Sequence, residues 1–221
     1  MRRLLLRILA VIVTGAVLLS IWAAVDLYIP HKVDIRDFDP DEVARLDTAM
    51  WRSYYSRQRL KLYFELTELL EKQYKLNFWR RQAMAFRAAK AAFVFKDGES
   101  RADYEKALPD LEDFYSEIRN ISTTDFDADQ AAKLELEWWI VHRQRKSYPP
   151  GSLSKALAET AAAVYDLPPE RFTEHADLRA EAMEIRDTKA EQGGVAEEDW
   201  AGIDDLLHRS WRSLYHAVNE K

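Results

Sequence analysis

The sequence has no cysteine, and it has only six glycines and seven prolines in 221 residues. Without cysteine the chain forms no disulfide, offers no thiolate ligand for a metal and has no cysteine nucleophile. Glycine-rich phosphate-binding loops are missing as well, and so are the motifs Cys-x-x-Cys-His, His-Glu-x-x-His and Gly-x-Ser-x-Gly. We therefore expect a protein that is not an enzyme.

An excess of positive charge is also lacking. Once the three arginines at the N-terminus are set aside, 29 basic and 38 acidic residues leave a net charge of −9. Nucleic-acid phosphates attract basic surfaces, so this balance argues against a nucleic-acid partner. The charge is uneven, because Pro40–Lys96 carries +6 and Asp97–Lys221 carries −13. Either the two halves pack together, or the basic half meets anionic lipid or an acidic partner and the acidic half meets a basic soluble partner.

One long apolar run is present, near the N-terminus. Arg2, Arg3 and Arg7 precede or border Ile8–Val25, which is 18 residues long and uncharged. A helix needs about 17–25 apolar residues to cross a bilayer core. We expect a retained membrane anchor, and the alternatives are a cleaved signal peptide and a buried helix. A signal peptide fits less well, because its apolar core is usually about 7–15 residues long and bulky Trp22 stands where small residues are favoured.

Flanking charge sets the expected orientation of this anchor. Positive residues next to a span stay on the cytoplasmic side, and the N-terminal flank carries +3, whereas the other flank is mixed. The C-terminal part is thus expected to be extracytoplasmic, which in a bacterial cell means periplasmic. Trp22 and Tyr28 lie near the outer end, where aromatic rings favour the membrane interface. The expected organisation is a cytoplasmic tail and anchor at 1–28, a linker at 29–39 and an extracytoplasmic domain at 40–221.

Beyond the anchor, the residue pattern is typical of helices and lacks the alternation of a strand. Caps at Asp39, Ser100 and Asp127, with breaks at glycine, proline and asparagine, predict helices at about 40–75, 78–96, 100–120, 127–147, 152–166, 169–191 and 196–218. Pro109 is expected to kink or split the third of these. The expected fold class is all-α: a single N-terminal transmembrane helix followed by an extramembrane antiparallel bundle of about six to seven helices.

The densest group of candidate functional residues lies in Leu134–Arg143, which is apolar around most of its circumference. Glu135, Glu137 and His142 are candidate metal ligands there, and His142 is also a candidate cofactor ligand. The favoured interpretation is a structural network in which a cation neutralises a carboxylate. A di-iron site needs two Glu-x-x-His motifs, and the chain has only one Asp-x-x-His, ending at His208. We expect no metal and no cofactor.

Aromatic and arginine residues gather at the end of the anchor and in the helices that follow the linker. They form a candidate interface with another protein, because these residue types are enriched where proteins bind. Its members are Trp22, Tyr28, Trp51, Tyr54, Tyr55, Arg57, Trp79 and Arg80. The alternative is a core on one helix face, with arginines reaching solvent from the other.

These observations favour a single-span accessory or scaffold subunit that docks on a larger membrane protein complex, such as a respiratory or photosynthetic assembly, and stabilises it. The expected partners are integral membrane protein subunits and the lipid bilayer. Thr14, Gly15, Ala16 and Ser20 give the anchor a side where another helix can approach closely. A membrane-anchored metal or redox enzyme with a buried Glu/His site is the first alternative. A periplasmic ligand-binding or sensor domain is the second.

Overall fold

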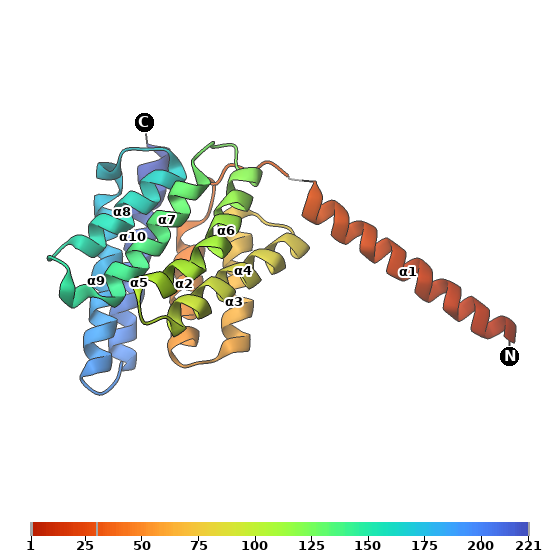
Figure 1. The fold of residues 1–221 in the computed structure, drawn as a ribbon, viewed down its shortest axis with the longest axis horizontal. Helices are drawn as coiled ribbons and strands as arrows, with labels where there is room; N and C mark the ends of the chain where they lie inside the picture. The colour runs from red at the N-terminus through yellow and green to blue at the C-terminus, as the bar shows by residue number, and fades with distance from the viewer. Residues whose placement is uncertain (1, 30, 221) are drawn as a thin grey trace.

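The computed structural model describes residues 2–29 and 31–220 (Figure 1). These residues are helical apart from turns and loops and contain no strand, and a lone β-bridge joins Val33 to Ser122. The expectation of an all-α chain is confirmed. The elements in chain order are α1 (Arg2–Tyr28), α2 (Pro40–Tyr55), α3 (Arg59–Tyr74), α4 (Phe78–Asp97), α5 (Arg101–Tyr104), η1 (Glu105–Ala107), α6 (Leu108–Ile121), α7 (Ala128–Arg143), η2 (Arg145–Ser147), α8 (Ser152–Tyr165), η3 (Pro169–Phe172), α9 (Thr173–Glu191) and α10 (Glu197–Asn219).

Local capping interactions explain where several helices begin. Asp39, Ser100 and Asp127 each accept a hydrogen bond from a backbone N–H in the first turn of α2, α5 and α7. These N–H groups have no partner inside their own helix, so the side chains complete their hydrogen bonding. All three predicted caps are confirmed. The expected split near Pro109 is confirmed too, because α5 ends at Tyr104 and α6 begins only after η1.

The helix predicted at about 40–75 is interrupted, and this part of the prediction is wrong. α2 ends at Tyr55 and α3 begins at Arg59, with Arg57 between them at a φ of 61°. A left-handed backbone at a residue other than glycine costs about 1–3 kcal/mol. Folding back places α3 against α2 and buries leucines such as Leu70, each contributing about 1.5–3 kcal/mol. Packing therefore outweighs the local strain.

One hydrophobic cluster forms the interior of the domain and draws on every helix from α2 to α10. The segment expected as a linker, 29–39, takes part in this cluster, because Val33, Ile35 and Phe38 are buried. Its backbone also pairs with the end of α6, where Val33 N donates to Ile121 O at 2.7 Å. Burial of these apolar side chains is favourable, so the part of this segment from Val33 to Phe38 packs against the domain.

α1 extends away from the domain and lies outside the hydrophobic cluster (Figure 1). It leaves on the side where α3 and α4 lie, whereas α9 and α10 lie on the far side (Figure 1). Within residues 2–29 and 31–220, α1 is the one helix long and apolar enough to cross a membrane, and its apolar side chains are exposed. A signal sequence near the N-terminus can meet the same criteria of helix length and hydropathy, so both a span and a signal are compatible with this helix.

Candidate docking site at the base of the N-terminal helix

α1 ends in a polar contact with the start of α4. Asp26 is 5% exposed, and its Oδ2 accepts a hydrogen bond from Trp79 N at 2.6 Å. Asn77 is the N-cap residue of α4, and its side chain makes no cap bond in the part of the chain that the structure describes. The Asp26 carboxylate therefore takes the place of a capping side chain. Its negative charge suits the positive end of the α4 dipole.

Arg80 of α4 binds the last backbone carbonyls of α1. Its Nε and Nη2 donate to Asp26 O at 3.0 and 2.7 Å, and Nη2 also donates to Leu27 O at 3.0 Å. Carbonyls at a helix end lack partners within the helix, and a cation there also matches the negative end of the dipole. Glu117 of α6 pairs with Arg80, whose side chain is 4% exposed. Each of the two helices thus caps the other.

Three aromatic rings surround this polar contact. Trp22 of α1 stacks on Phe78 with ring centroids 5.8 Å apart, and it meets Trp79 edge-on at 5.6 Å. Phe78 and Trp79 contact each other at 5.1 Å. Aromatic pairs at such separations contribute about 0.5–1.5 kcal/mol beyond the burial of their area. We refer to the whole contact as the joint; it consists of Trp22, Asp26, Phe78, Trp79, Arg80 and Glu117.

An exposed apolar surface lies beside the joint on α3 and α4. We call it the α3–α4 face, and it consists of Leu60, Phe64, Phe78, Phe86 and Phe93. Leu60 is 79% exposed, and Phe64 and Phe86 are 65% and 64% exposed. The three phenylalanines of α4 are eight and seven residues apart, which places them on one stripe of the helix. Because Phe78 also belongs to the joint, apolar surface continues from the end of α1 along α4.

Positive charge surrounds the α3–α4 face. Residues 57–96 contain ten basic and three acidic side chains. All three acids lie in ion pairs: Glu65 with Lys61, Glu68 with Arg45 and Glu71 with Arg81. A surface of this kind complements a partner that offers apolar side chains and negative charge.

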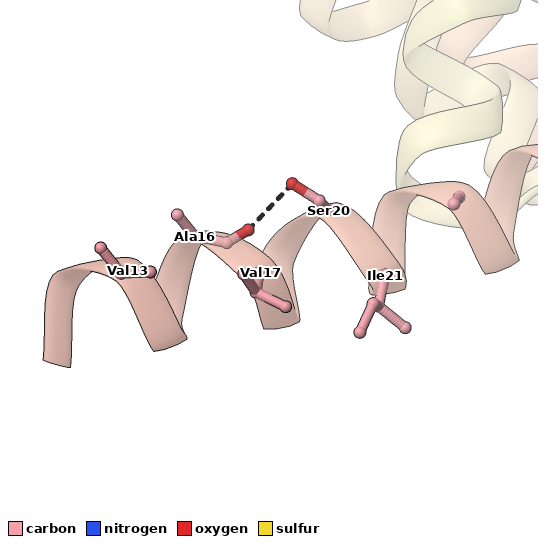
Figure 2. A pocket seen from close by; sticks show the side chains of 6 residues that line it. Val13, Ala16, Val17, Ser20 and Ile21 are labelled. Atoms are coloured by element: carbon pink, nitrogen blue, oxygen red, sulfur yellow. Dashed lines mark hydrogen bonds between the residues drawn. The ribbon is translucent and has the colours of Figure 1, made fainter. Parts of the chain in front are cut away.

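The membrane-length part of α1 has a side on which small residues alternate with β-branched ones. A shallow groove along this side is lined by Val13, Ala16, Val17, Ser20, Ile21 and Ala24 (Figure 2). Ser20 Oγ donates to Ala16 O at 2.9 Å, so its hydroxyl is satisfied within the helix. Ala16 and Ser20 were among the small residues noted in the sequence, whereas Thr14 and Gly15 do not line the groove. Trp22 projects from about the opposite side, given roughly 100° per residue.

Trp51, predicted as part of an interface, lies in the core. It is 8% exposed, and Arg179 Cζ lies 5.4 Å from the centre of its ring. α2 packs against α10, and the side of α2 that carries Trp51 faces inward, so the chain itself covers this residue. The other predicted interface residues lie in the joint (Trp22, Trp79 and Arg80), at the exposed end of α1 (Tyr28) and beside the α2–α3 turn (Tyr54, Tyr55 and Arg57).

The candidate metal ligands of α7 have three separate sets of neighbours. Glu135 accepts hydrogen bonds from Tyr115 Oη at 2.8 Å and from the Trp139 indole at 2.9 Å. Burial and the nearby Glu135 charge raise the pKa of Tyr115, so its hydroxyl stays a donor. Glu137 pairs with an arginine of α5 at 2.8 Å, and His142 Nε2 lies 3.1 Å from an aspartate of α9. Among the described residues, no group of three or more His, Cys, Asp or Glu side chains is arranged to hold a metal.

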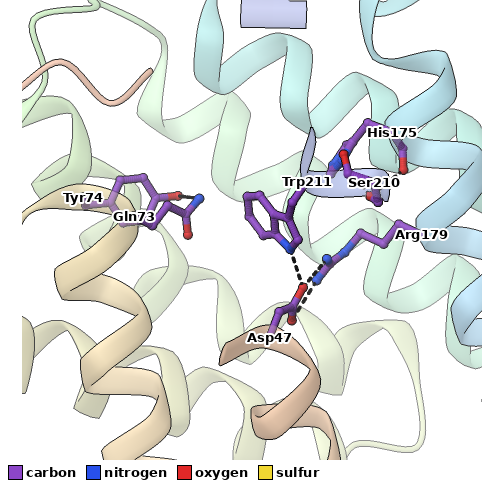
Figure 3. Close-up of polar contacts among 7 residues, drawn as sticks. All are labelled: Asp47, Gln73, Tyr74, His175, Arg179, Ser210 and Trp211. Atoms are coloured by element: carbon purple, nitrogen blue, oxygen red, sulfur yellow. Dashed lines mark hydrogen bonds and ion pairs between the residues drawn. The ribbon is translucent and has the colours of Figure 1, made fainter. Parts of the chain in front are cut away.

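A second buried polar cluster joins α2, α9 and α10, and we call it the core network (Figure 3). Asp47, which is 1% exposed, accepts hydrogen bonds from Arg179 Nη1 at 2.5 Å and from Trp211 Nε1 at 2.9 Å. In the same region, Ser210 Oγ lies 2.8 Å from His175 Nδ1. Burial lowers the pKa of His175 to about 4, and the positive charge of Arg179 acts in the same direction. This imidazole is therefore neutral at pH 7.

The sequence-based candidates did not include Asp26 or Glu117. Asp26 gave one signal, since it is the first charged residue after the uncharged run and therefore falls near the end of the helix. Glu117 gave none, because its partner lies 37 residues away. The chain matches no protein-family model, no curated protein and no solved structure with which it was compared.

Proposed function

We propose that this protein is a single-pass, membrane-anchored accessory subunit that docks on an integral membrane protein and holds its helical domain at the extracytoplasmic surface. The joint is the observation that carries the proposal, because it couples the direction of α1 to the orientation of the domain. A domain that needs only a tether gains nothing from a fixed span. A flexible linker of a few residues serves that purpose.

The chemistry of the joint suits the outer boundary of a bilayer. Arg80 is 3% exposed, and its hydrogen bonds to the carbonyls of α1 are charge-assisted bonds worth about 1.5–3 kcal/mol. Trp22 and Trp79 shield this contact from solvent, and tryptophan favours the level of the lipid headgroups. Both properties support a joint at the membrane surface, where the apolar span gives way to the polar domain.

The orientation follows from the positive charge of the N-terminal flank. Arg2, Arg3 and Arg7 favour retention of this end in the cytoplasm, and this supports a domain outside, which is the periplasm of a bacterial cell. The helices that carry the α3–α4 face lie on the side of the domain from which α1 leaves (Figure 1). In this arrangement the face is directed towards the membrane surface and towards proteins embedded beside the span.

Two surfaces are proposed to bind the partner together. Within the bilayer, a helix of the partner packs on the groove of α1, where Ala16, Ser20 and Ala24 permit close approach of two backbones. Outside the bilayer, an apolar and acidic surface of the partner covers Phe64 and Phe86 of the α3–α4 face. The joint is proposed to hold both surfaces in one rigid body. Binding of the partner to the groove of α1 then raises the effective concentration of the partner at the α3–α4 face.

The proposed role is non-catalytic. The partly buried Glu135 already accepts hydrogen bonds from a tyrosine and a tryptophan, which supports a structural role for this carboxylate. The α3–α4 face, in contrast, leaves large apolar side chains exposed to solvent. Exposed apolar surface next to a membrane span is typical of a protein-binding site.

Purification from the native membrane in a mild detergent tests the proposal. The full-length chain is expected to co-purify with an integral membrane protein in a fixed ratio. Ala16→Leu/Ser20→Leu fills the groove with bulky side chains and is expected to abolish this co-purification while leaving the chain in the membrane. The matched control, Val11→Leu/Leu18→Phe, enlarges about the opposite side of α1 and is expected to retain the partner.

A second pair of variants tests the outer surface. Phe64→Ser/Phe86→Ser removes exposed apolar area from the α3–α4 face and is expected to weaken co-purification without lowering the stability of the domain, since both rings are already in solvent. Extraction of the wild-type chain from the membrane as a monomer, without a stoichiometric partner, would contradict the proposed function.

A further inference from the structure

A cavity of about 440 Å³ opens where the α2–α3 turn meets the end of α4 and the middle of α9. Its polar lining consists of Ser53, Arg57, Arg59, Lys96 and Arg186. Its apolar lining includes Leu62 and Phe93, together with the rings of Tyr54 and Tyr55. Binding pockets for small molecules fall in this size range and combine apolar walls with a few polar groups.

The lining of this cavity carries four cations and no carboxylate among the residues that the structure describes. Arg57, Arg59 and Lys96 form no ion pair with any residue in 2–29 or 31–220. Arg186 is the exception, since its Nη1 donates to Asp187 Oδ1 at 2.6 Å behind the cavity wall. Unpaired cations that converge on one space repel each other, and a bound anion relieves this repulsion.

A buried hydroxyl points to the same conclusion. Ser53 is 1% exposed, and its Oγ has no hydrogen-bond partner in the described part of the chain. Arg186 Nε also lacks a partner there. A buried polar group without a partner is costly, and its presence calls for a bonding partner that is not part of the protein. Both atoms belong to residues that line the cavity.

Stacking holds the guanidinium groups in place. Arg59 Cζ lies 5.7 Å from the centre of the Phe93 ring, and Arg186 Cζ lies 3.1 Å from the centre of the Tyr55 ring. Arg57 has a φ of 61°, which is unusual for a residue other than glycine. Strained backbone of this kind clusters at functional sites, because the surrounding structure must maintain it. The guanidinium groups of Arg59 and Arg186 are therefore positioned before any ligand arrives.

We propose that this cavity binds a phosphate group attached to an apolar or aromatic body. The phosphate accepts hydrogen bonds from Arg57, Arg59, Lys96 and Arg186, and Ser53 supplies a fifth donor. The planar fork of arginine matches phosphate oxygens in pairs, and a dianion balances more of the positive charge than one carboxylate does. Two sources offer this chemistry: the headgroup of a membrane phospholipid and a soluble phosphate monoester.

Titration calorimetry on the full-length chain in detergent tests the site with phenyl phosphate as the probe. Phenyl phosphate is expected to bind more tightly than phenol, and raising the salt concentration is expected to weaken the binding of phenyl phosphate. Arg57→Gln/Arg59→Gln is expected to weaken binding at least about tenfold, because two charge-assisted bonds are lost. Lys133→Gln/Arg209→Gln removes the same charge outside the cavity and is expected to leave binding unchanged. Equal affinity for phenol and phenyl phosphate, or equal binding by both double variants, overturns the proposal.

Ser53→Ala separates ligand binding from folding. Removing a buried hydroxyl that has no partner in the protein is expected to leave the unfolding midpoint unchanged or to raise it. The same variant is expected to bind phenyl phosphate several-fold more weakly, because one donor is gone. An unchanged affinity in this well-folded variant removes Ser53 from the site and contradicts the argument from its unpaired hydroxyl.

Lipid discs of defined composition distinguish the two sources of phosphate. The full-length chain is placed in phosphatidylcholine discs that contain either phosphatidic acid or the same charge density of oleate. If phosphatidic acid blocks phenyl phosphate and oleate does not, the site takes a lipid headgroup. If phenyl phosphate binds equally in both, the site takes a soluble phosphate monoester. Absence of binding in both kinds of disc overturns the proposal.

Discussion

Two buried sets of aspartate, arginine and tryptophan hold this molecule together in different ways. In the core network, Asp47 of α2 binds side chains from α9 and α10, namely Arg179 and Trp211. In the joint, Asp26 binds a backbone N–H of α4, and Arg80 binds backbone carbonyls of α1. The core network joins side chains across the interior, whereas the joint satisfies two helix ends.

This difference has consequences for what each cluster controls. The core network lies among fully buried residues of α2, α9 and α10, so the domain loses packing when the network is broken. The joint connects the domain to α1, which lies outside the hydrophobic cluster. Opening the joint therefore releases the orientation of α1 and leaves the core packed. One cluster controls folding, and the other controls the geometry that the proposed docking requires.

The largest effect is expected for Asp47→Ala. The substitution leaves Arg179 buried without its partner, and breaking a buried ion pair in this way costs about 3–5 kcal/mol. Urea unfolding of the full-length chain in detergent measures this loss of free energy. Asp41→Ala, on the same helix as Asp47, is the control, because the pair of Asp41 with Arg212 of α10 is about half exposed and is expected to contribute little. Equal stability of the two variants would show that the core network does not hold the domain together.

The next largest effect is a pH dependence from His175. In the folded chain the pKa of His175 is about 4, against 6.5 for an ordinary histidine. Between pH 4 and pH 6.5 the unfolded chain therefore binds a proton at this residue that the folded chain does not bind. Stability is therefore fully present above pH 6.5 and falls by about 3 kcal/mol as the pH is lowered to 4. Unfolding free energies measured across this window test the expectation.

Two features separate this pH dependence from other titrations. His216→Gln is expected to leave the slope unchanged, since the His216 side chain is 64% exposed. Asp187 titrates lower: burial alone would raise its pKa, but His142, Arg186 and Arg145 outweigh this and lower it. The contribution of ionised Asp187 to stability is therefore lost only below pH 3.8, outside the range of pH 6.5 to 4 in which His175 acts. A flat profile between pH 6.5 and 4 would contradict the buried, neutral state of His175.

Interactions between residues that are close together in the chain were predictable from the sequence. Asp39, Ser100 and Asp127 cap helices through N–H groups two or three residues away, and the pattern of residue types was sufficient to predict them. The turn at Arg57 was missed, because no glycine or proline marks it and its strain is offset only by packing of α2 on α3. The position of Trp51 in the core likewise depends on tertiary packing, in this case of α2 against α10.

The candidate site was predictable only in part for the same physical reason. Trp22, Trp79 and Arg80 were recognised from their residue types, but the contact between them depends on chain folding. Asp26 and Arg80 are 54 residues apart, and no local rule pairs them. A single sequence shows which side chains are suited to an interface, and the tertiary fold decides which of them the protein uses within itself.

A smaller effect on stability, with a clear effect on geometry, is expected for Arg80→Gln. The substitution removes bonds to the carbonyls of α1 and the pair with Glu117, at a cost of about 2 kcal/mol. Because the natural chain has no cysteine, spin labels can be attached at Ala10→Cys and Glu198→Cys alone. In the Arg80→Gln variant, the distribution of distances between these labels is expected to be broader than in the chain with Arg80. Arg87 lies on the same helix as Arg80 and forms an exposed ion pair with Asp113 of α6. Arg87→Gln removes this pair and is expected to leave the distance distribution narrow.

The smallest effect is expected for Asp26→Asn, and it tests whether the joint works by charge or by shape. Asparagine keeps an oxygen that can accept the bond from Trp79 N, whereas the interaction of the carboxylate with the α4 dipole is lost, which amounts to about 0.3–1 kcal/mol. The label distances are expected to stay narrow, whereas Asp26→Leu, which removes the acceptor, is expected to broaden them. Broadening in both variants would mean that the negative charge is essential. A narrow distribution in both would assign the fixed direction of α1 to Arg80 and the aromatic rings, because the backbone carbonyls that Arg80 binds remain in every variant.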